Sequence, residues 1–236
     1  MLTSLNLCGN KLQKLPCTTF KGLRYLKELS LRLNDLKILE PGGFKELVNL
    51  NKLDLSDNRS LQLQIGVFQG LKNLRILKLD WCGLAVLPSK LFTDLVNLRK
   101  LDLSYNKLTE LHADTFAGLE ALEKLDLAQN QLKLLSSKVF SRMKNLTRLI
   151  INSNNITRLP AGIFSGLNNL QEINLGFNNL KTIEPELFDG PTNLTRIILW
   201  GNVLLTKHNI KTLRKKLPHV EILFKSSKHK QNCTIM

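Results

Sequence analysis

The chain has 236 residues, and its 43% hydrophobic content is enough to build a sizeable core. Its formal net charge of +15 comes from 34 Lys or Arg against 19 Asp or Glu. The sequence has no apolar run long enough for a membrane-spanning helix, and no basic region followed by an apolar run of the kind that marks a secretory signal. Its four cysteines lack the spacing of a zinc site or of a dense disulfide framework, so they leave the redox compartment undecided.

A period of 24 residues runs through most of the chain. Asparagine recurs at this interval, with Cys82 in the one missing place, and a phenylalanine follows ten residues after each of the first eight positions. Such a period indicates stacked structural repeats. The asparagines are Asn10, Asn34, Asn58, Asn106, Asn130, Asn154, Asn178 and Asn202, and the phenylalanines are Phe20, Phe44, Phe68, Phe92, Phe116, Phe140, Phe164 and Phe188.

Leucines fill the other fixed places, and the unit reads LxxLxLxxNxLxxLxxxxFxxLxxL, with Leu101, Leu103 and Asn106 as one example. This pattern resembles the leucine-rich-repeat family, in its 24-residue type common in animal receptor ectodomains and matrix proteoglycans. The resemblance covers residues 2 to about 202. It implies a curved solenoid of about nine repeats, with a parallel β-sheet on the concave face and loops with short helical turns on the convex face.

The same fold follows from the residues themselves. Alternation at Leu101 and Leu103 predicts a short strand with one buried face in each unit, and stacked units bury their leucines against one another. Each asparagine amide can satisfy turn backbone that the strand leaves unpaired, so we expect a buried structural asparagine ladder. The phenylalanines are expected to stack as a spine. At Ser60, where other repeats have Leu or Ile, we expect a local bulge.

Beyond the leucine-rich repeats at 1–205, residues 206–224 are expected to form a C-terminal cap. Ile210, Leu213 and Leu217 have helical spacing among basic residues, and Pro218 ends the predicted helix before a short apolar strand. Residues 225–236 form a basic tail that is expected to be flexible. At the other end, the first strand begins almost at Met1, which leaves its leucines without a cover, so we expect the chain to be a fragment or an incomplete gene model.

Residues that flank the strand leucines point away from the core and predict a binding surface on the concave face. Exposed aromatic side chains on such a face are typical of interface hot spots. A column of Lys52, Lys100, Lys124 and Arg148 beside Asp54, Asp102 and Asp126 is interpreted mainly as a solubilising charge ladder. The candidate ligand-binding residues are Arg32, Asp80, Trp81, Tyr105, Asn152, Phe177 and Trp200.

These residues predict a non-catalytic module that binds a protein ligand, in the manner of receptor or matrix recognition. The sequence offers no catalytic constellation, no metal-ligand spacing and no cofactor-binding motif, so we expect neither an enzyme nor a cofactor. The basic tail could contact an anionic membrane surface. It lacks interleaved aromatic residues, which argues against a nucleic-acid partner.

Two features of the sequence predict different cellular locations. Exposed Asn-x-Ser/Thr motifs at Asn145, Asn155 and Asn193 are candidate glycosylation sites and favour an extracellular or cell-surface location; Asn58 has the motif too but is expected to be buried. The last four residues, from Cys233, match a C-a-a-X lipidation motif, with lysines upstream. The alternative is therefore a farnesylated adaptor or signalling scaffold on the cytosolic face of a membrane.

Overall fold

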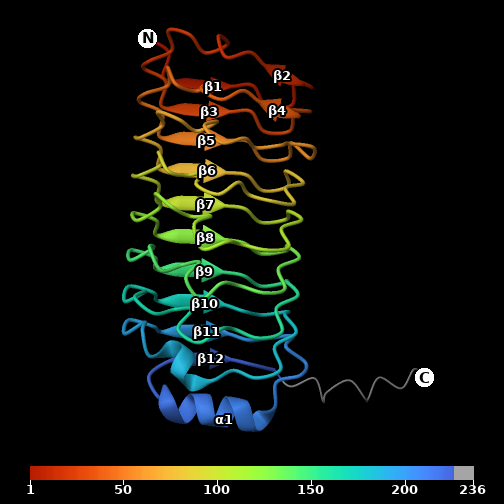
Figure 1. Cartoon of the computed structure of the whole chain (residues 1–236), viewed down its shortest axis with the longest axis vertical. Helices are drawn as coiled ribbons and strands as arrows, with labels where there is room; N and C mark the ends of the chain where they lie inside the picture. Colours follow the sequence, from red (N-terminus) through yellow and green to blue (C-terminus); the bar gives the residue numbers. More distant parts are fainter. Residues whose placement is uncertain (226–236) are drawn as a thin grey trace, which may run out of the picture.

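The computed structural model describes residues 1–225 as a stack of short parallel strands, with β1 at one end and the helix α1 at the other (Figure 1). The main sheet has ten strands in the order β1-β3-β5-β6-β7-β8-β9-β10-β11-β12, and β2 pairs with β4 in a second, small sheet. The elements are β1 (Ser4–Asn6), β2 (Lys14–Leu15), β3 (Glu28–Ser30), β4 (Ile38–Leu39), β5 (Lys52–Asp54), β6 (Ile76–Lys78), β7 (Lys100–Asp102), β8 (Lys124–Asp126), β9 (Arg148–Ile150), β10 (Glu172–Asn174), the 3-10 helix η1 (Pro185–Phe188), β11 (Arg196–Ile198), α1 (Lys207–Lys216) and β12 (Glu221–Leu223).

The strand register reproduces the sequence period. Leu101 in β7 lies opposite Leu77 in β6 and Leu125 in β8, and each of these leucines is buried. The flanking residues of each strand point to the other face, because side chains alternate along a strand. Nine strands, β1, β3 and β5 to β11, belong to the repeats, so the predicted solenoid with a parallel sheet and about nine repeats is confirmed.

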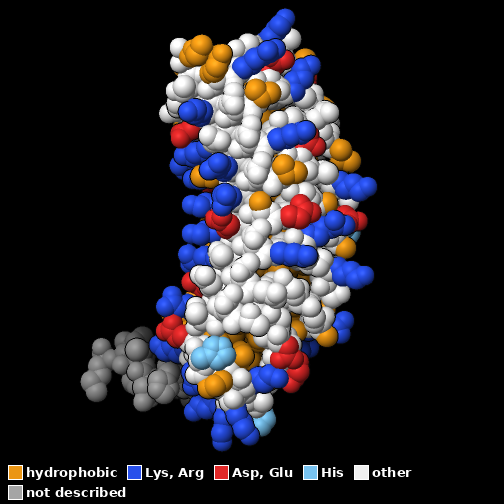
Figure 2. Space-filling view, turned by 90° about the vertical axis from the view of Figure 1, so that its left-hand side faces the viewer, with side chains coloured by type: hydrophobic (Ala, Val, Ile, Leu, Met, Phe, Trp, Pro, Cys, Tyr) orange, Lys and Arg blue, Asp and Glu red, His pale blue; other side chains and the backbone are white. Residues whose placement is uncertain are grey.

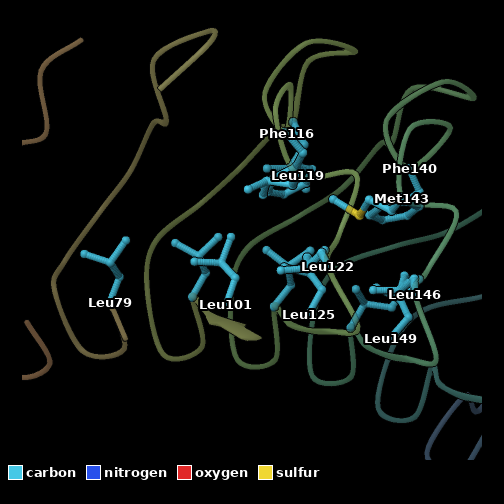
Figure 3. Close-up of a cluster of buried hydrophobic side chains, with 14 of the residues drawn as sticks. Leu79, Leu101, Phe116, Leu119, Leu122, Leu125, Phe140, Met143, Leu146 and Leu149 are labelled. Carbon is cyan, nitrogen blue, oxygen red and sulfur yellow. The ribbon is translucent and has the colours of Figure 1, made fainter. Parts of the chain in front are cut away.

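The core is one continuous layer between the sheet and the returning loops. Figure 3 shows the strand leucines Leu101, Leu125 and Leu149 on one side, with Phe116 and Phe140 on the opposite side. The rings of Phe116 and Phe140 stack with centroids 6.4 Å apart, and the pairs Phe20–Phe44, Phe68–Phe92, Phe92–Phe116 and Phe164–Phe188 stack in the same way. Each ring therefore packs between repeats, and the stability of one repeat depends on its neighbours.

Buried asparagines join consecutive repeats through their side-chain amides. The Asn106 amide donates to the carbonyls of Leu79 (2.8 Å) and Leu103 (3.0 Å), and its Oδ1 accepts from the backbone N–H groups of Cys82 (3.1 Å) and Leu84 (3.0 Å). One side chain thus satisfies backbone groups in two repeats that no strand pairs. Asn10, in the first repeat, is exposed, and within residues 1–225 its side-chain amide donates only to the Cys8 carbonyl.

Cys82 occupies the ladder position of the fourth repeat. Its thiol is fully buried and donates to the Leu55 carbonyl at a sulfur–oxygen distance of 3.2 Å, the contact that an asparagine amide makes elsewhere. A thiol offers one weak donor where an amide offers two donors and an acceptor. Burial raises the pKa of the Cys82 thiol to about 12, which keeps it protonated.

The third repeat departs from the others at the expected place. Ser60 is exposed, and the neighbouring Leu61 turns inward to fill the core position with only 3% of its surface accessible. The Leu61 N–H donates to the Asn58 carbonyl (3.0 Å), which closes a tight turn after the ladder asparagine. The Arg59 carbonyl lies close to Gly83 of the next repeat.

The C-terminal end of the stack is covered by α1 and β12. The buried faces of Ile210 and Leu213 in α1 pack on the last core layer, while β12 pairs with β11. Thr206 caps the N-terminus of α1, since its hydroxyl accepts from the Asn209 N–H (3.2 Å). Within the part of the chain that the structure describes, no helix is long and apolar enough to cross a membrane.

Candidate functional site

The residues that follow each strand form two rows along the sheet. One row lies two places before the ladder position and includes Arg32, Asp80, Asn152 and Trp200. The other lies one place before it and includes Trp81, Tyr105 and Phe177, which have positive φ angles of 58°, 55° and 52°. Glycine holds the same position in the first and ninth repeats, at Gly9 and Gly201. This second row therefore lies in left-handed turns just beyond the strands. We call this row of turns the sheet rim.

The structure brings two of the predicted aromatic residues together on the rim. The rings of Trp81 and Tyr105 stack with centroids 4.4 Å apart and planes 10° apart, and both side chains are about half exposed. The guanidinium of Arg59 lies over the Trp81 ring, 5.8 Å from its centroid. Three side chains from three successive repeats thus form one stacked group, which we call the Arg59–Trp81–Tyr105 stack.

Phe177 and Trp200 belong to a second exposed group, farther along the stack in the eighth and ninth repeats. Phe177 is 60% exposed and Trp200 is 46% exposed. The rim residues between the two groups are Gln129 and Ser153. The four predicted aromatic residues therefore lie on one edge of the solenoid in two separate patches.

The three polar candidates make local contacts. Arg32 pairs with Asp57 at 3.1 Å, and the Ser56 hydroxyl donates to Asp80 at 2.6 Å. The side-chain amide of Asn152 donates to the Ser153 hydroxyl. Burial raises the pKa of Asp80, and the hydrogen bond from Ser56 partly offsets that rise.

The acidic column on the sheet has a structural role that the sequence did not reveal. Asp54, Asp102 and Asp126 each accept a hydrogen bond from the backbone N–H two residues later. Asn6 and Asn174 make the same contact at the equivalent position, so the bond requires an oxygen and not a charge. Burial, and the nearby carboxylate of Asp102, raise the pKa of Asp126 to about 6. The hydrogen bond at this position thus does not need the negative charge that Asp54, Asp102 and Asp126 carry.

The basic column lies at the beginning of the strands and is paired with acids in its C-terminal part. Arg148 contacts Glu172 at 2.9 Å, and Arg196 contacts Glu221 at 2.7 Å. Over the face drawn in Figure 2, Lys and Arg side chains outnumber Asp and Glu. This agrees with the net charge of +15.

The candidate glycosylation sites differ in their contacts. Asn145 and Asn193 belong to a second asparagine ladder, in which the side-chain amide donates to a backbone carbonyl of the preceding repeat, at 3.0 Å to Glu120 and 2.9 Å to Asn168. Asn49, Asn73, Asn97 and Asn169 make the same contact. Asn155 is exposed, and Cys233 lies outside the described residues. The regular spacing of these asparagines in the sequence could have identified the second ladder.

No cluster of His, Cys, Asp or Glu suited to hold a metal ion occurs among residues 1–225. The described surface presents aromatic faces, hydrogen-bonding groups and charges of both signs.

Repeats that stack strand on strand and share one core define a solenoid of the class that presents a long sheet and its rim to other molecules. A family model described as leucine rich repeat matches residues 1–59, 49–108, 72–132 and 144–204. The chain belongs to the leucine-rich repeat family, and the resemblance inferred from the sequence is confirmed.

The solved structures that share the fold include two ligand complexes. The chain is similar to TLR13 in the crystal structure of its complex with ssRNA13, with 27% sequence identity, a TM-score of 0.88, and coverage of 97% of this chain and 33% of that one. It also resembles a chain of the Toll–Spatzle complex of Drosophila, with 22% identity, a TM-score of 0.72, and coverage of 92% and 32%. The chain thus spans about a third of the length of each. A search of curated proteins finds no match.

Proposed function

We propose that the chain is a non-catalytic recognition module that binds a protein ligand on its sheet face and rim, in the manner of an extracellular receptor. The observation that carries this proposal is the exposure of four aromatic side chains along one edge of the sheet, at 43% for Trp81, 44% for Tyr105, 60% for Phe177 and 46% for Trp200. Large aromatic groups left in water along one edge favour a partner that covers them.

The similarity to receptor chains supports the same proposal. The two solved structures are complexes of TLR13 with ssRNA13 and of Toll with Spatzle, so chains of this fold take macromolecular ligands of different chemistry. A protein ligand is favoured here because the sheet carries the carboxylates of Asp80 and Asp102 beside its basic residues, and a polyanion that followed the sheet would be repelled by them.

A bait experiment tests this function. The wild-type chain and a variant with Trp81, Tyr105 and Phe177 changed to Gln and Trp200 changed to Ser are used to capture partners, and each captured protein is then purified and its affinity measured. The substitutions copy Gln129 and Ser104, which hold the same two repeat positions. We expect a partner that loses at least about tenfold in affinity for the variant. Partners that bind both baits equally would remove the basis of the proposal.

The farnesylated adaptor remains the second candidate, and the observation that favours it is the C-terminal Cys233-Thr234-Ile235-Met236 sequence. Intact mass of the chain made in its native cells separates the two. A farnesyl increment on Cys233 would place it on the cytosolic side, whereas glycans on Asn145, Asn155 or Asn193 would place it in the secretory pathway.

A further inference from the structure

A hollow lies on the rim beside the two stacked aromatic rings. Trp81 and Tyr105 line it together with Arg59, Gly83, Lys107 and Gln129, and we call it the Arg59 hollow. The charged side chains that line this hollow are Arg59 and Lys107. Both are cationic and exposed. It combines an apolar wall with positive charge, whereas the carboxylates of Asp80 and Asp102 lie on the adjoining part of the sheet.

The irregular third repeat contributes Arg59 to this hollow. Arg59 lies within the tight turn from Asn58 to Leu61, and its backbone approaches the fourth repeat so closely that a Cβ atom on Gly83 would lie 2.2 Å from the Arg59 carbonyl oxygen. Only glycine leaves room for that approach. The guanidinium is thereby held over Trp81, whose other neighbour in the stack is Tyr105. A departure from the repeat pattern thus produces a defined local site.

The two cations of the Arg59 hollow are available to a partner. The carboxylate nearest to Arg59 is Asp57, at 3.9 Å, and Asp57 is held more closely by Arg32, at 3.1 Å. The Arg59 side chain is 74% exposed. Among the residues that the structure describes, Lys107 takes part in no ion pair. A carboxylate brought by a partner would therefore meet charges that the chain itself leaves largely uncompensated.

We propose that the Arg59 hollow docks an acidic segment of a protein partner, with carboxylates near Arg59 and Lys107 and an apolar or aromatic side chain against the Trp81–Tyr105 pair. The proposal rests on the proposed function and names the chemistry of the ligand. The net charge of +15 favours encounter with an anionic partner. The Arg59 guanidinium already lies over the Trp81 ring, beside the apolar wall.

A short acidic segment fits this surface better than a nucleic acid. The hollow spans only the third to sixth repeats, and Asp80 and Asp102 stand on the adjoining sheet face. A continuous phosphate backbone that followed the solenoid would pass these carboxylates, whereas a short peptide need not. Stacking on the two rings is open to either ligand, so the charge pattern decides between them.

The test is a selection from a random peptide library of about twelve residues on the wild-type chain. Enriched peptides are synthesised, labelled with a fluorophore, and titrated by anisotropy against wild type and the double variant Arg59→Gln/Lys107→Gln. We expect acidic peptides with an apolar or aromatic residue, and at least about tenfold weaker binding to the double variant. The single variant Tyr105→Gln should weaken binding as well, because it removes half of the apolar wall.

The matched control is Lys133→Gln/Lys181→Gln, which removes the same charge from exposed positions of other repeats. It should bind like wild type, and circular dichroism should show all variants folded. The proposal is overturned if the enriched peptides are neutral or basic, if the control weakens binding as much as the double variant, or if a single-stranded RNA dodecamer displaces the peptides and depends on the same two cations. A natural partner that requires Phe177 and Trp200 but ignores Arg59 would overturn this inference and leave the proposed function standing.

Discussion

The ring of Phe177 covers the place that a side chain on Gly201 would need. A Cβ atom on Gly201 would lie 2.5 Å from Phe177 Cδ1, and Gly201 itself has a φ of +72°. The exposed ring of Phe177, in the eighth repeat, thus packs on the backbone of Gly201, in the ninth. This contact explains how a 60% exposed phenylalanine is held in a defined position on the rim.

Gly201→Ala should destabilise the chain by about 2 kcal/mol, because it adds a clash with the ring to the strain of a left-handed alanine. Gly162→Ala is the control, since Gly162 has the same φ of +72° and open space around its Cβ position. It should cost about 1 kcal/mol, from backbone strain alone. Urea unfolding of both variants gives the comparison. Equal losses would mean that the Phe177 ring moves aside freely.

Asn106→Ala should destabilise the chain by about 3 kcal/mol, because it leaves the backbone groups of Cys82, Leu84, Leu79 and Leu103 without their buried partner. Asn10→Ala should cost less than about 1 kcal/mol, since Asn10 is exposed. Thermal unfolding measures both. A similar small loss at the two positions would contradict the role assigned to the buried ladder.

Cys82 should resist alkylation in the folded chain. Its thiol is buried and its pKa is raised to about 12, so little thiolate forms and no reagent reaches it. Cys8 and Cys17 are exposed and should be modified readily. Iodoacetamide labelling followed by peptide mapping resolves each cysteine, and labelling in denaturant should add Cys82. Labelling of Cys82 at the rate of Cys8 without denaturant would be inconsistent with the buried ladder position.

Asp126→Asn should stabilise the chain above pH 6. The pKa of the folded Asp126 is raised to about 6, mainly by burial, so its charged form is disfavoured in the folded state. The resulting penalty is fully present above pH 6 and is relieved as the pH falls toward the ordinary value of 3.8. The asparagine keeps the hydrogen bond from the Ala128 N–H, as Asn174 does with Gly176.

The expected gain from Asp126→Asn is about 1 to 2 kcal/mol at pH 7.5 and nearly zero at pH 4. Urea unfolding at several pH values measures the difference between variant and wild type. A difference that does not change between pH 7.5 and pH 4 would show that Asp126 titrates normally in the folded chain.

Much of the fold could be predicted because the repeat makes equivalent positions visible. The spacing of Asn106 and Phe116, with leucines between, is enough to assign strand, turn and spine, since each position repeats eight or nine times. The second asparagine ladder is also periodic. Because Asn145 and Asn193 lie at the surface within Asn-x-Ser/Thr motifs, the sequence alone led us to interpret them as glycosylation sites. We likewise interpreted the carboxylate of Asp102 as a solubilising charge, because no sequence pattern indicates the hydrogen bond that it accepts from the Ser104 N–H.

By itself, the sequence determined the period, the family, the buried face of each strand and the exposed aromatic residues. The reason is that repeats with leucines at equivalent positions bury them by stacking in register on one another. Only the tertiary structure decided which exposed residues meet. The inward turn of Leu61, the approach of the Arg59 backbone to Gly83 and the stacking of Trp81 on Tyr105 depend on backbone angles and on packing between repeats. Residue spacing fixes which positions are equivalent, but packing between the irregular third repeat and the fourth places Arg59 over Trp81.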